Sequence, residues 1–127
     1  MEVTNITKIS MGEVASLAEN GIYACERNSF CEDHVTSALE AIEKVLQKHL
    51  DEAVEVYVNG VKLNNAEQVT LRSELTDDEF LVVMTFRDAD DKAVASWRVS
   101  PDSCAYICVT SYGHGSIFIT TGRGIVQ

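Results

Sequence analysis

The sequence predicts an α+β fold in which two N-terminal helices pack on one face of an antiparallel meander of about six strands. In the first fifty residues the apolar side chains recur at helical spacing. From residue 54 onward they alternate with polar ones, in short runs separated by turn residues. A block of helices followed by a block of strands is typical of α+β proteins. The length of 127 residues fits a single domain, residues 1–127, with one hydrophobic core.

The first helix is predicted at residues 11–20 by signals at both of its ends. Ser10 is a suitable N-cap, and Glu13 three residues later completes a capping box. Gly21 suits the left-handed position that follows the last helical turn. The side chains expected to face inward are Val14, Leu17 and Ala18.

A longer helix of about twenty residues is predicted to follow. It begins at a second capping box, formed by Ser29 and Glu32. Its apolar face comprises Val35, Ala38, Leu39, Ile42, Val45, Leu46 and Leu50. Its opposite, solvent-facing side comprises Glu40, Glu43, Lys44, Gln47 and Lys48. An apolar face of this length needs a large apolar surface to pack on, and a sheet is the obvious candidate.

A β-hairpin is predicted around Asn59-Gly60, which is a strong signal for a type I′ turn because both central residues of that turn need positive φ. A two-residue turn places Val58 opposite Val61. It also places Val56 opposite Leu63, so the apolar side chains of both strands face the same side.

The most apolar segment, residues 80–86, is predicted to be a central strand that is covered on both faces. A strand at residues 93–99 is expected to end at Pro101, which has no N–H to donate to a ladder. Further strands are expected around Val69 and Leu71, and at residues 104–110 and 116–121. Because both helices would cover one face of the sheet, its other face would need cover from a dimer partner or a target protein.

The chain is strongly acidic, with 20 Asp and Glu against 10 Lys and Arg and a formal net charge of −10. The acidic residues form two clusters: Glu74, Asp77, Asp78 and Glu79 in one, and Asp88, Asp90 and Asp91 in the other. Solvated loops that keep the protein soluble are the simpler interpretation. The alternative is a surface that attracts a basic partner protein. A strand between the clusters would hold them about 30 Å apart, which excludes a shared metal ion.

Composition and motifs argue against several classes of protein. Direct binding of nucleic acid needs a surplus of Lys and Arg, which the chain lacks. No apolar run is long enough to span a membrane, and no signal peptide is evident, so cytoplasmic localisation is expected. The four cysteines form no CxxC pair and are best explained as small buried hydrophobes in a reducing compartment. A metal site of Cys25, Cys31 and His34 matches no familiar spacing, so neither a metal nor a cofactor is expected.

His114 is the residue with the clearest potential for a ligand site. It lies between Gly113 and Gly115, whose lack of side chains would let a ligand approach the backbone. A general base needs a hydrogen-bonding partner, and no nearby Asp, Ser or Cys in the sequence supplies one, so a simple loop histidine is favoured. The alternative is a pocket between the helices and a curved sheet, as in a small-molecule-binding protein or an enzyme. Its lining residues would be Trp97, Tyr112, His114 and Arg123.

The leading hypothesis is a non-catalytic binding protein that inhibits or neutralises a basic partner, such as a nuclease or another nucleic-acid-binding protein. No catalytic motif is recognisable, and clustered loop carboxylates suit the blocking of a basic surface. Immunity proteins, antitoxins and phage-encoded inhibitors of defence nucleases have this profile, which is an analogy of class alone. A homodimer or a larger homo-oligomeric assembly that buries the uncovered sheet face is a further alternative.

Overall fold

The computed structural model describes residues 2–12, 14, 30–75, 80–101, 104 and 106–121. It confirms the α+β class, with one long helix and eight strands in these residues. In chain order the elements are β1 (Val3–Ser10), α2 (Phe30–Glu52), β2 (Glu55–Val58), β3 (Val61–Leu63), β4 (Gln68–Leu75), β5 (Phe80–Arg87), β6 (Ala93–Val99), β7 (Tyr106–Tyr112) and β8 (Ser116–Thr121). No helix in the described part of the chain is long and apolar enough to cross a membrane.

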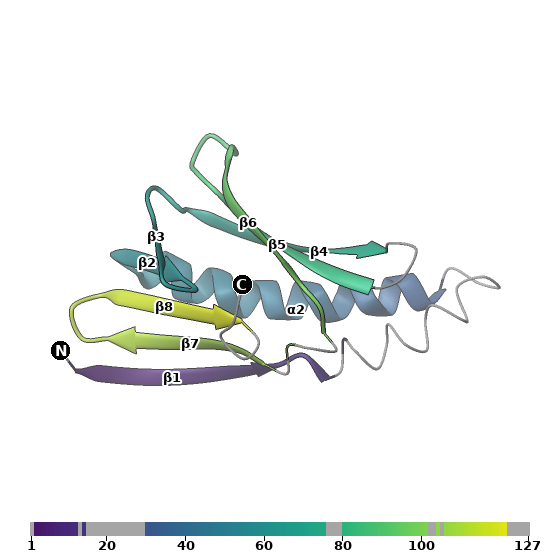
Figure 1. Cartoon of the computed structure of the whole chain (residues 1–127), viewed down its shortest axis with the longest axis horizontal. Helices are drawn as coiled ribbons and strands as arrows, with labels where there is room; N and C mark the ends of the chain where they lie inside the picture. The colour runs from purple at the N-terminus through teal and green to yellow at the C-terminus, as the bar shows by residue number, and fades with distance from the viewer. Residues whose placement is uncertain are drawn as a thin grey trace.

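The strands form two sheets with one long helix beside them, so the prediction of two helices on a single meander is wrong (Figure 1). The larger sheet has the order β1-β7-β8-β2-β3, in which β2 and β8 run parallel and the other neighbours run antiparallel. The smaller sheet is the antiparallel meander β4-β5-β6. Two pairings, β1 with β7 and β2 with β8, join segments far apart in the chain. Alternation of apolar residues identifies a strand but not its neighbour, so the sequence pattern does not reveal these pairings.

Strand β1 is an element that the sequence analysis does not predict. Five of its eight residues are Val, Ile or Thr, which strands favour. It ends where the first helix is expected to begin, and the Gly12 N–H donates to Ser10 Oγ at 3.1 Å, which confirms Ser10 as a cap. Gly12 and Val14 are helical, and the remainder of the predicted first helix lies outside the described residues.

Helix α2 forms as predicted, and its apolar face lies in the core. Its buried residues are Val35, Leu39, Ile42, Leu46 and Leu50. Val45, which the sequence analysis places on the same face, is 39% exposed because it lies at the margin of the buried stripe. The expected cap Ser29 lies outside the described residues.

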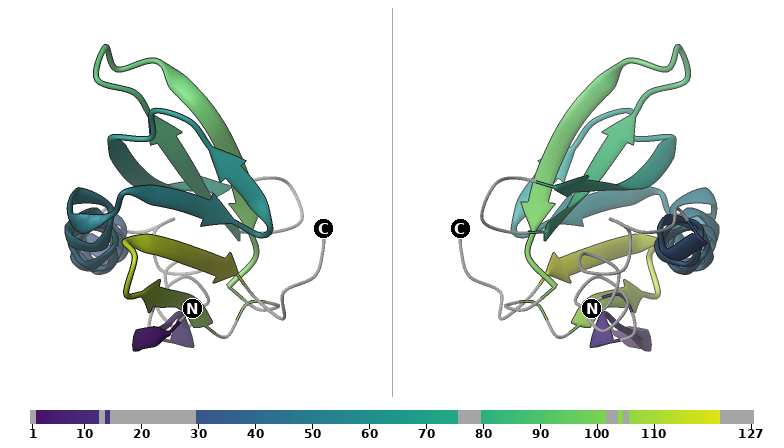
Figure 2. Two further views of the ribbon diagram at one scale, coloured as in Figure 1. Left: turned by 90° about the vertical axis from the view of Figure 1, so that its left-hand side faces the viewer. Right: turned by 90° about the vertical axis from the view of Figure 1, so that its right-hand side faces the viewer.

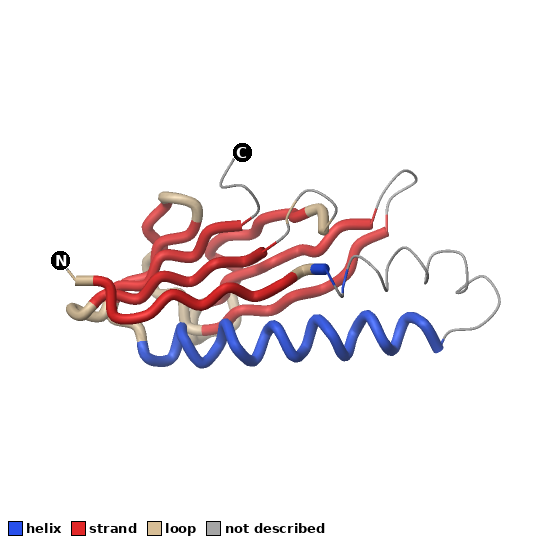
Figure 3. Tube along the Cα trace, turned by 90° about the horizontal axis from the view of Figure 1, so that it is seen from below, coloured by secondary structure: helices blue, strands red, loops and turns tan. Residues whose placement is uncertain are grey.

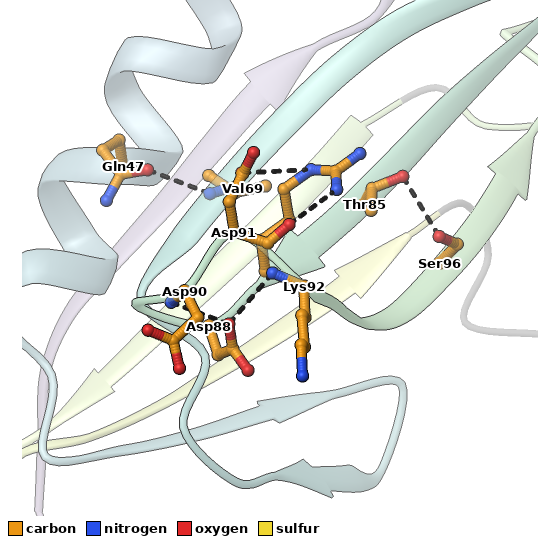
Figure 4. A network of polar contacts seen from close by, with 9 residues as sticks. Gln47, Val69, Thr85, Asp88, Asp90, Asp91, Lys92 and Ser96 are labelled. Carbon is orange, nitrogen blue, oxygen red and sulfur yellow. Dashed lines mark hydrogen bonds and ion pairs between the residues drawn. The ribbon is translucent and has the colours of Figure 1, made fainter.

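Two polar side chains of α2 bind the free edge of β4, although the sequence analysis expects them to face solvent. Glu43 Oε1 accepts the Leu71 N–H at 2.9 Å. One helical turn later, Gln47 Oε1 accepts the Val69 N–H at 2.9 Å (Figure 4). Gln47 Nε2 also donates to the Glu67 carbonyl at 2.9 Å. These bonds satisfy backbone groups that no strand pairs, so the helix closes the β4 edge of the smaller sheet.

The core lies between the inner faces of the two sheets, and α2 runs alongside the strands at one side of it (Figure 2; Figure 3). The smaller sheet contributes Val82, Met84 and Phe86. The larger sheet contributes Val56, Val58, Leu63, Ile107, Val109, Ile117 and Ile119. Strand β5 is central in its sheet, as predicted, but among the described residues only its inner face lies in the hydrophobic core, and Thr85 is the one buried residue of its other face. Leu81 and Val83, on its other face, are half-buried, because the described core residues of β5 all lie on its inner side.

The β2–β3 hairpin forms in the predicted register, with Val56 opposite Leu63. Asn59 and Gly60 have φ angles of 49° and 84°, as a type I′ turn requires. The Asn59 side chain accepts the Thr121 N–H at 3.0 Å and donates to Thr121 Oγ1 at 3.0 Å. These two hydrogen bonds connect the β2–β3 turn to the end of β8.

Candidate functional site

The described members of the two acidic clusters lie in or next to different strands, Glu74 in β4 and Asp88, Asp90 and Asp91 in the turn after β5. In the first cluster, Glu74 lies in β4, and its Oε1 is 2.9 Å from Arg98 Nε in β6. The hydrogen bond that Arg98 donates to Glu74, and then the negative charge of Glu74, raise the pKa of Arg98 above its ordinary value. Glu74 is therefore engaged within its own sheet. The other residues of this cluster, Asp77, Asp78 and Glu79, lie outside the described residues.

The second acidic cluster forms the turn between β5 and β6 (Figure 4). Asp88 Oδ1 accepts the N–H groups of Asp90 at 2.9 Å and of Lys92 at 3.0 Å. Asp91 has a positive φ of 64°, and its N–H donates to the Asp88 carbonyl at 3.0 Å. Asp88 therefore shapes the turn with its own carboxylate, whereas Asp90 and Asp91 stand exposed on it.

Two further acidic residues, Asp51 near the end of α2 and Glu67 just before β4, are connected to the start of this turn by hydrogen bonds of Gln47 and of the Glu67 backbone. Gln47 Nε2 donates to Asp51 Oδ1 at 2.9 Å and to the Glu67 carbonyl at 2.9 Å. The Glu67 N–H donates to the Arg87 carbonyl at 2.8 Å, immediately before the turn. We name Asp51, Glu67, Asp88, Asp90 and Asp91 the acidic end. Asp51 and Glu67 are not predicted from the sequence to lie near the turn, because long stretches of chain separate them from it.

His114 has the hydrogen-bonding partner that the sequence analysis does not find. Its Nε2 lies 2.6 Å from Ser116 Oγ, and the Ser116 hydroxyl donates to Glu55 Oε1 at 2.9 Å. Glu55 Oε2 in turn lies 3.0 Å from Lys62 Nζ. Side chains two residues apart on a regular strand are about 7 Å apart, but the turn at Gly115 brings these two together.

This set of contacts does not make an activated serine. Ser116 has one hydroxyl hydrogen, which is directed at Glu55, so His114 Nε2 must be the donor toward Ser116 Oγ. A histidine that activates a serine has to accept that hydrogen instead. Ser116 is also only 1% exposed. The network therefore connects the β7–β8 turn to β2 and β3, and its role is structural.

The stabilising contribution of Glu55 is expected to be lost in acid. The hydrogen bonds from Lys62 and then Ser116, together with the charge of Lys62, lower the pKa of Glu55 from its ordinary 4.5. A lowered pKa in the folded state stabilises the protein above pH 4.5, and that contribution is lost as the pH falls through the folded-state value. Urea denaturation of Glu55→Gln and of the wild type should give a stability difference at pH 7 that shrinks steadily below pH 4.5. Lys62→Met, which removes the same ion pair, should behave alike, and a difference independent of pH would contradict this assignment.

The structure brings together two of the four predicted pocket residues. The rings of Tyr112 and His114 have centroids 5.9 Å apart at the β7–β8 end of the larger sheet. Trp97 lies in β6 and packs against the core, with its ring edge-on to Phe86 at 5.9 Å. Arg123 lies outside the described residues. His114 is exposed, which counts against a deep pocket around its ring.

The close approach at Gly115 is made by the chain itself. Gly115 has a φ of 98°, and a Cβ placed on it would lie 2.6 Å from Val54 Cγ2. The Val54 N–H donates to the Gly115 carbonyl at 2.7 Å. Val54 therefore fills the space beside Gly115 that a ligand would approach in the alternative interpretation of a pocket.

In the described part of the chain no group of three or more His, Cys, Asp or Glu side chains is placed to hold a metal ion. Comparison with protein-family models, with curated proteins and with solved structures gives no match to this chain. The arrangement of its own residues is therefore the basis for assigning a function.

Proposed function

We propose that this protein is a non-catalytic binding protein that inhibits a basic partner protein by covering its positively charged surface. The acidic end is the surface that makes this contact. The observation that carries the proposal is that three segments distant in sequence place acidic residues around Gln47 and the β5–β6 turn. A chain of net charge −10 attracts a basic protein from a distance, and a clustered acidic surface orients the encounter.

The turn that carries Asp90 and Asp91 is held by hydrogen bonds within the chain itself. Asp88 holds two backbone N–H groups of the turn, so docking requires little further ordering of this segment. Within the described residues Asp90 makes no ion pair, and Asp91 has only Arg87 at 3.9 Å. Both carboxylates are therefore available to cations on a partner.

The charge of the acidic end also supports a particular class of partner. Proteins that bind nucleic acid neutralise phosphates with clustered Lys and Arg. An acidic protein seated on such a cluster competes with nucleic acid for the same side chains. We therefore infer a nuclease or another nucleic-acid-binding protein, whose basic groove is blocked when the complex forms.

The test is the association rate with a basic partner that has been captured from the host and then purified. We expect this rate to fall as salt rises, because exposed charges act mainly on the encounter. The double variant Asp90→Asn/Asp91→Asn should lower the rate constant by about threefold or more at low salt. The same variant should weaken inhibition of the partner's binding to nucleic acid.

The matched control is Glu2→Gln/Glu40→Gln, which also removes two exposed carboxylates, but outside the acidic end. Its effect on the association rate should be clearly smaller. Equal effects of the two double variants would mean that net charge alone matters and that the acidic end is not the docking surface. A rate that responds neither to salt nor to Asp90→Asn/Asp91→Asn would overturn the proposed function.

A further inference from the structure

Strand β1 is an open edge of the larger sheet. It pairs with β7 on one side, and on its other side its backbone groups have no hydrogen-bond partner among the described residues. The β4 edge of the smaller sheet differs, because Glu43 and Gln47 accept two of its N–H groups, those of Leu71 and Val69. Unpaired N–H and C=O groups in a row are matched by the backbone of another extended strand.

The features that usually prevent a sheet edge from pairing with another strand, such as bulges and exposed charges, are weak along most of β1. A bulge lies at Thr4, near the start of the strand, and the pairing from Asn5 to Ser10 is regular. The ammonium of Lys8 lies 5.7 Å from the centre of the Tyr106 ring, so its charge is drawn over its own sheet. Ile6, in the regular part, is 61% exposed. An exposed apolar side chain on such an edge favours pairing with a further strand.

The low charge of the β1 edge favours a second copy of this chain as the partner. Residues 2–12 contain one acidic and one basic side chain, Glu2 and Lys8, in a chain whose net charge is −10. Two copies of the chain repel each other through most of their surfaces, whereas at this edge the only like charges that approach are the two Lys8 side chains, each of which lies over the Tyr106 ring of its own copy. The other open edges are less suitable. Strand β3 has three residues, and β6 begins beside the acidic turn with a bulge at Val94.

We propose that two copies of this chain pair through β1, antiparallel and about a two-fold axis within residues 5–9. The two five-stranded sheets then join into one continuous sheet, and Ile6 is covered by the partner copy. This inference does not depend on the proposed inhibitory function, because β1 contains none of the residues of the acidic end.

The test is sedimentation over a concentration series for the wild type and for two matched variants. Ile6→Lys places one added cation at the joint in each copy, at a position already 61% exposed. It should weaken self-association by at least about tenfold, since like charges then face each other in the interface. Val61→Lys makes a similar change on β3, at the other edge of the same sheet, where the side chain is 53% exposed. It should leave self-association unchanged.

Amide hydrogen exchange provides a second readout. In the wild type, the amides of β1 should become more protected as the protein concentration rises, whereas those of β3 should not. A wild-type protein that is monomeric at every concentration overturns the proposal. So does a dimer that Ile6→Lys and Val61→Lys weaken equally, or one whose β1 amides exchange at the same rate at every concentration.

Discussion

Gly115→Ala is expected to lower the free energy of unfolding by about 3 kcal/mol, the largest effect of any single change considered. The backbone at this position has a φ of 98°, which costs a residue with a Cβ about 1–2 kcal/mol. The new methyl group would also stand 2.6 Å from Val54 Cγ2, and relieving such a contact typically costs about 1–3 kcal/mol. Urea denaturation of the wild type and the variant measures the sum.

Two further variants separate the contributions at Gly115. Gly60→Ala meets nothing within 4 Å and has a similar φ of 84°, so it should show the backbone cost alone. Adding Val54→Ala to Gly115→Ala removes the nearest clashing atom, and the double variant should recover part of the loss relative to Val54→Ala alone. Equal destabilisation by Gly115→Ala and Gly60→Ala would show that Val54 does not restrict this position.

Gln47→Met is expected to destabilise the protein by about 2 kcal/mol. Methionine preserves the helix propensity and the length of the side chain but cannot accept the Val69 N–H or donate to the Glu67 carbonyl. A donor at the β4 edge is then left without its partner, and the cost of such a loss exceeds the net value of an ordinary hydrogen bond. The free energy of unfolding and the exchange rate of the Val69 amide are the measurements.

Lys48→Met is the matched control for this prediction, because it introduces the same residue one position further along α2, where the side chain is exposed. It should change the free energy of unfolding by less than about 0.5 kcal/mol and leave Val69 exchange unaltered. If Gln47→Met were as mild as Lys48→Met, the helix would not be closing the β4 edge. Because Gln47 also donates to Asp51, Gln47→Met should in addition remove the hydrogen bond that holds Asp51 within the acidic end.

The elements with strong local signals are the ones that the sequence predicts correctly. The hairpin register follows from Asn59-Gly60, because a two-residue turn with two positive φ angles leaves one way to align the flanking valines. The buried face of α2 follows from the 3.6-residue period of its apolar side chains. For the candidate site, the sequence predicts the position of the acidic turn beyond β5, and its exposed residues are Asp90 and Asp91.

The missed features all depend on which segments become neighbours. Strand β1 has the composition of a strand, but its partner β7 lies at the other end of the chain. The sequence predicts that Glu43 and Gln47 face solvent, because their positions on α2 are polar. Only the approach of β4 gives these side chains backbone N–H groups to bind. The contact of Ser116 with Glu55 likewise requires β8 to lie beside β2.

By itself, then, the sequence determines the α+β class, the hairpin, the apolar face of the long helix and the excess of acid. Those features arise from residues close together in the chain, whose φ preferences and periodicity act locally. Only the tertiary structure decides that there are two sheets, that Val54 occupies the space beside Gly115, and that Asp51 and Glu67 are connected to the start of the acidic turn. The physical reason is that packing and edge hydrogen bonds depend on long-range pairing, which no single segment encodes.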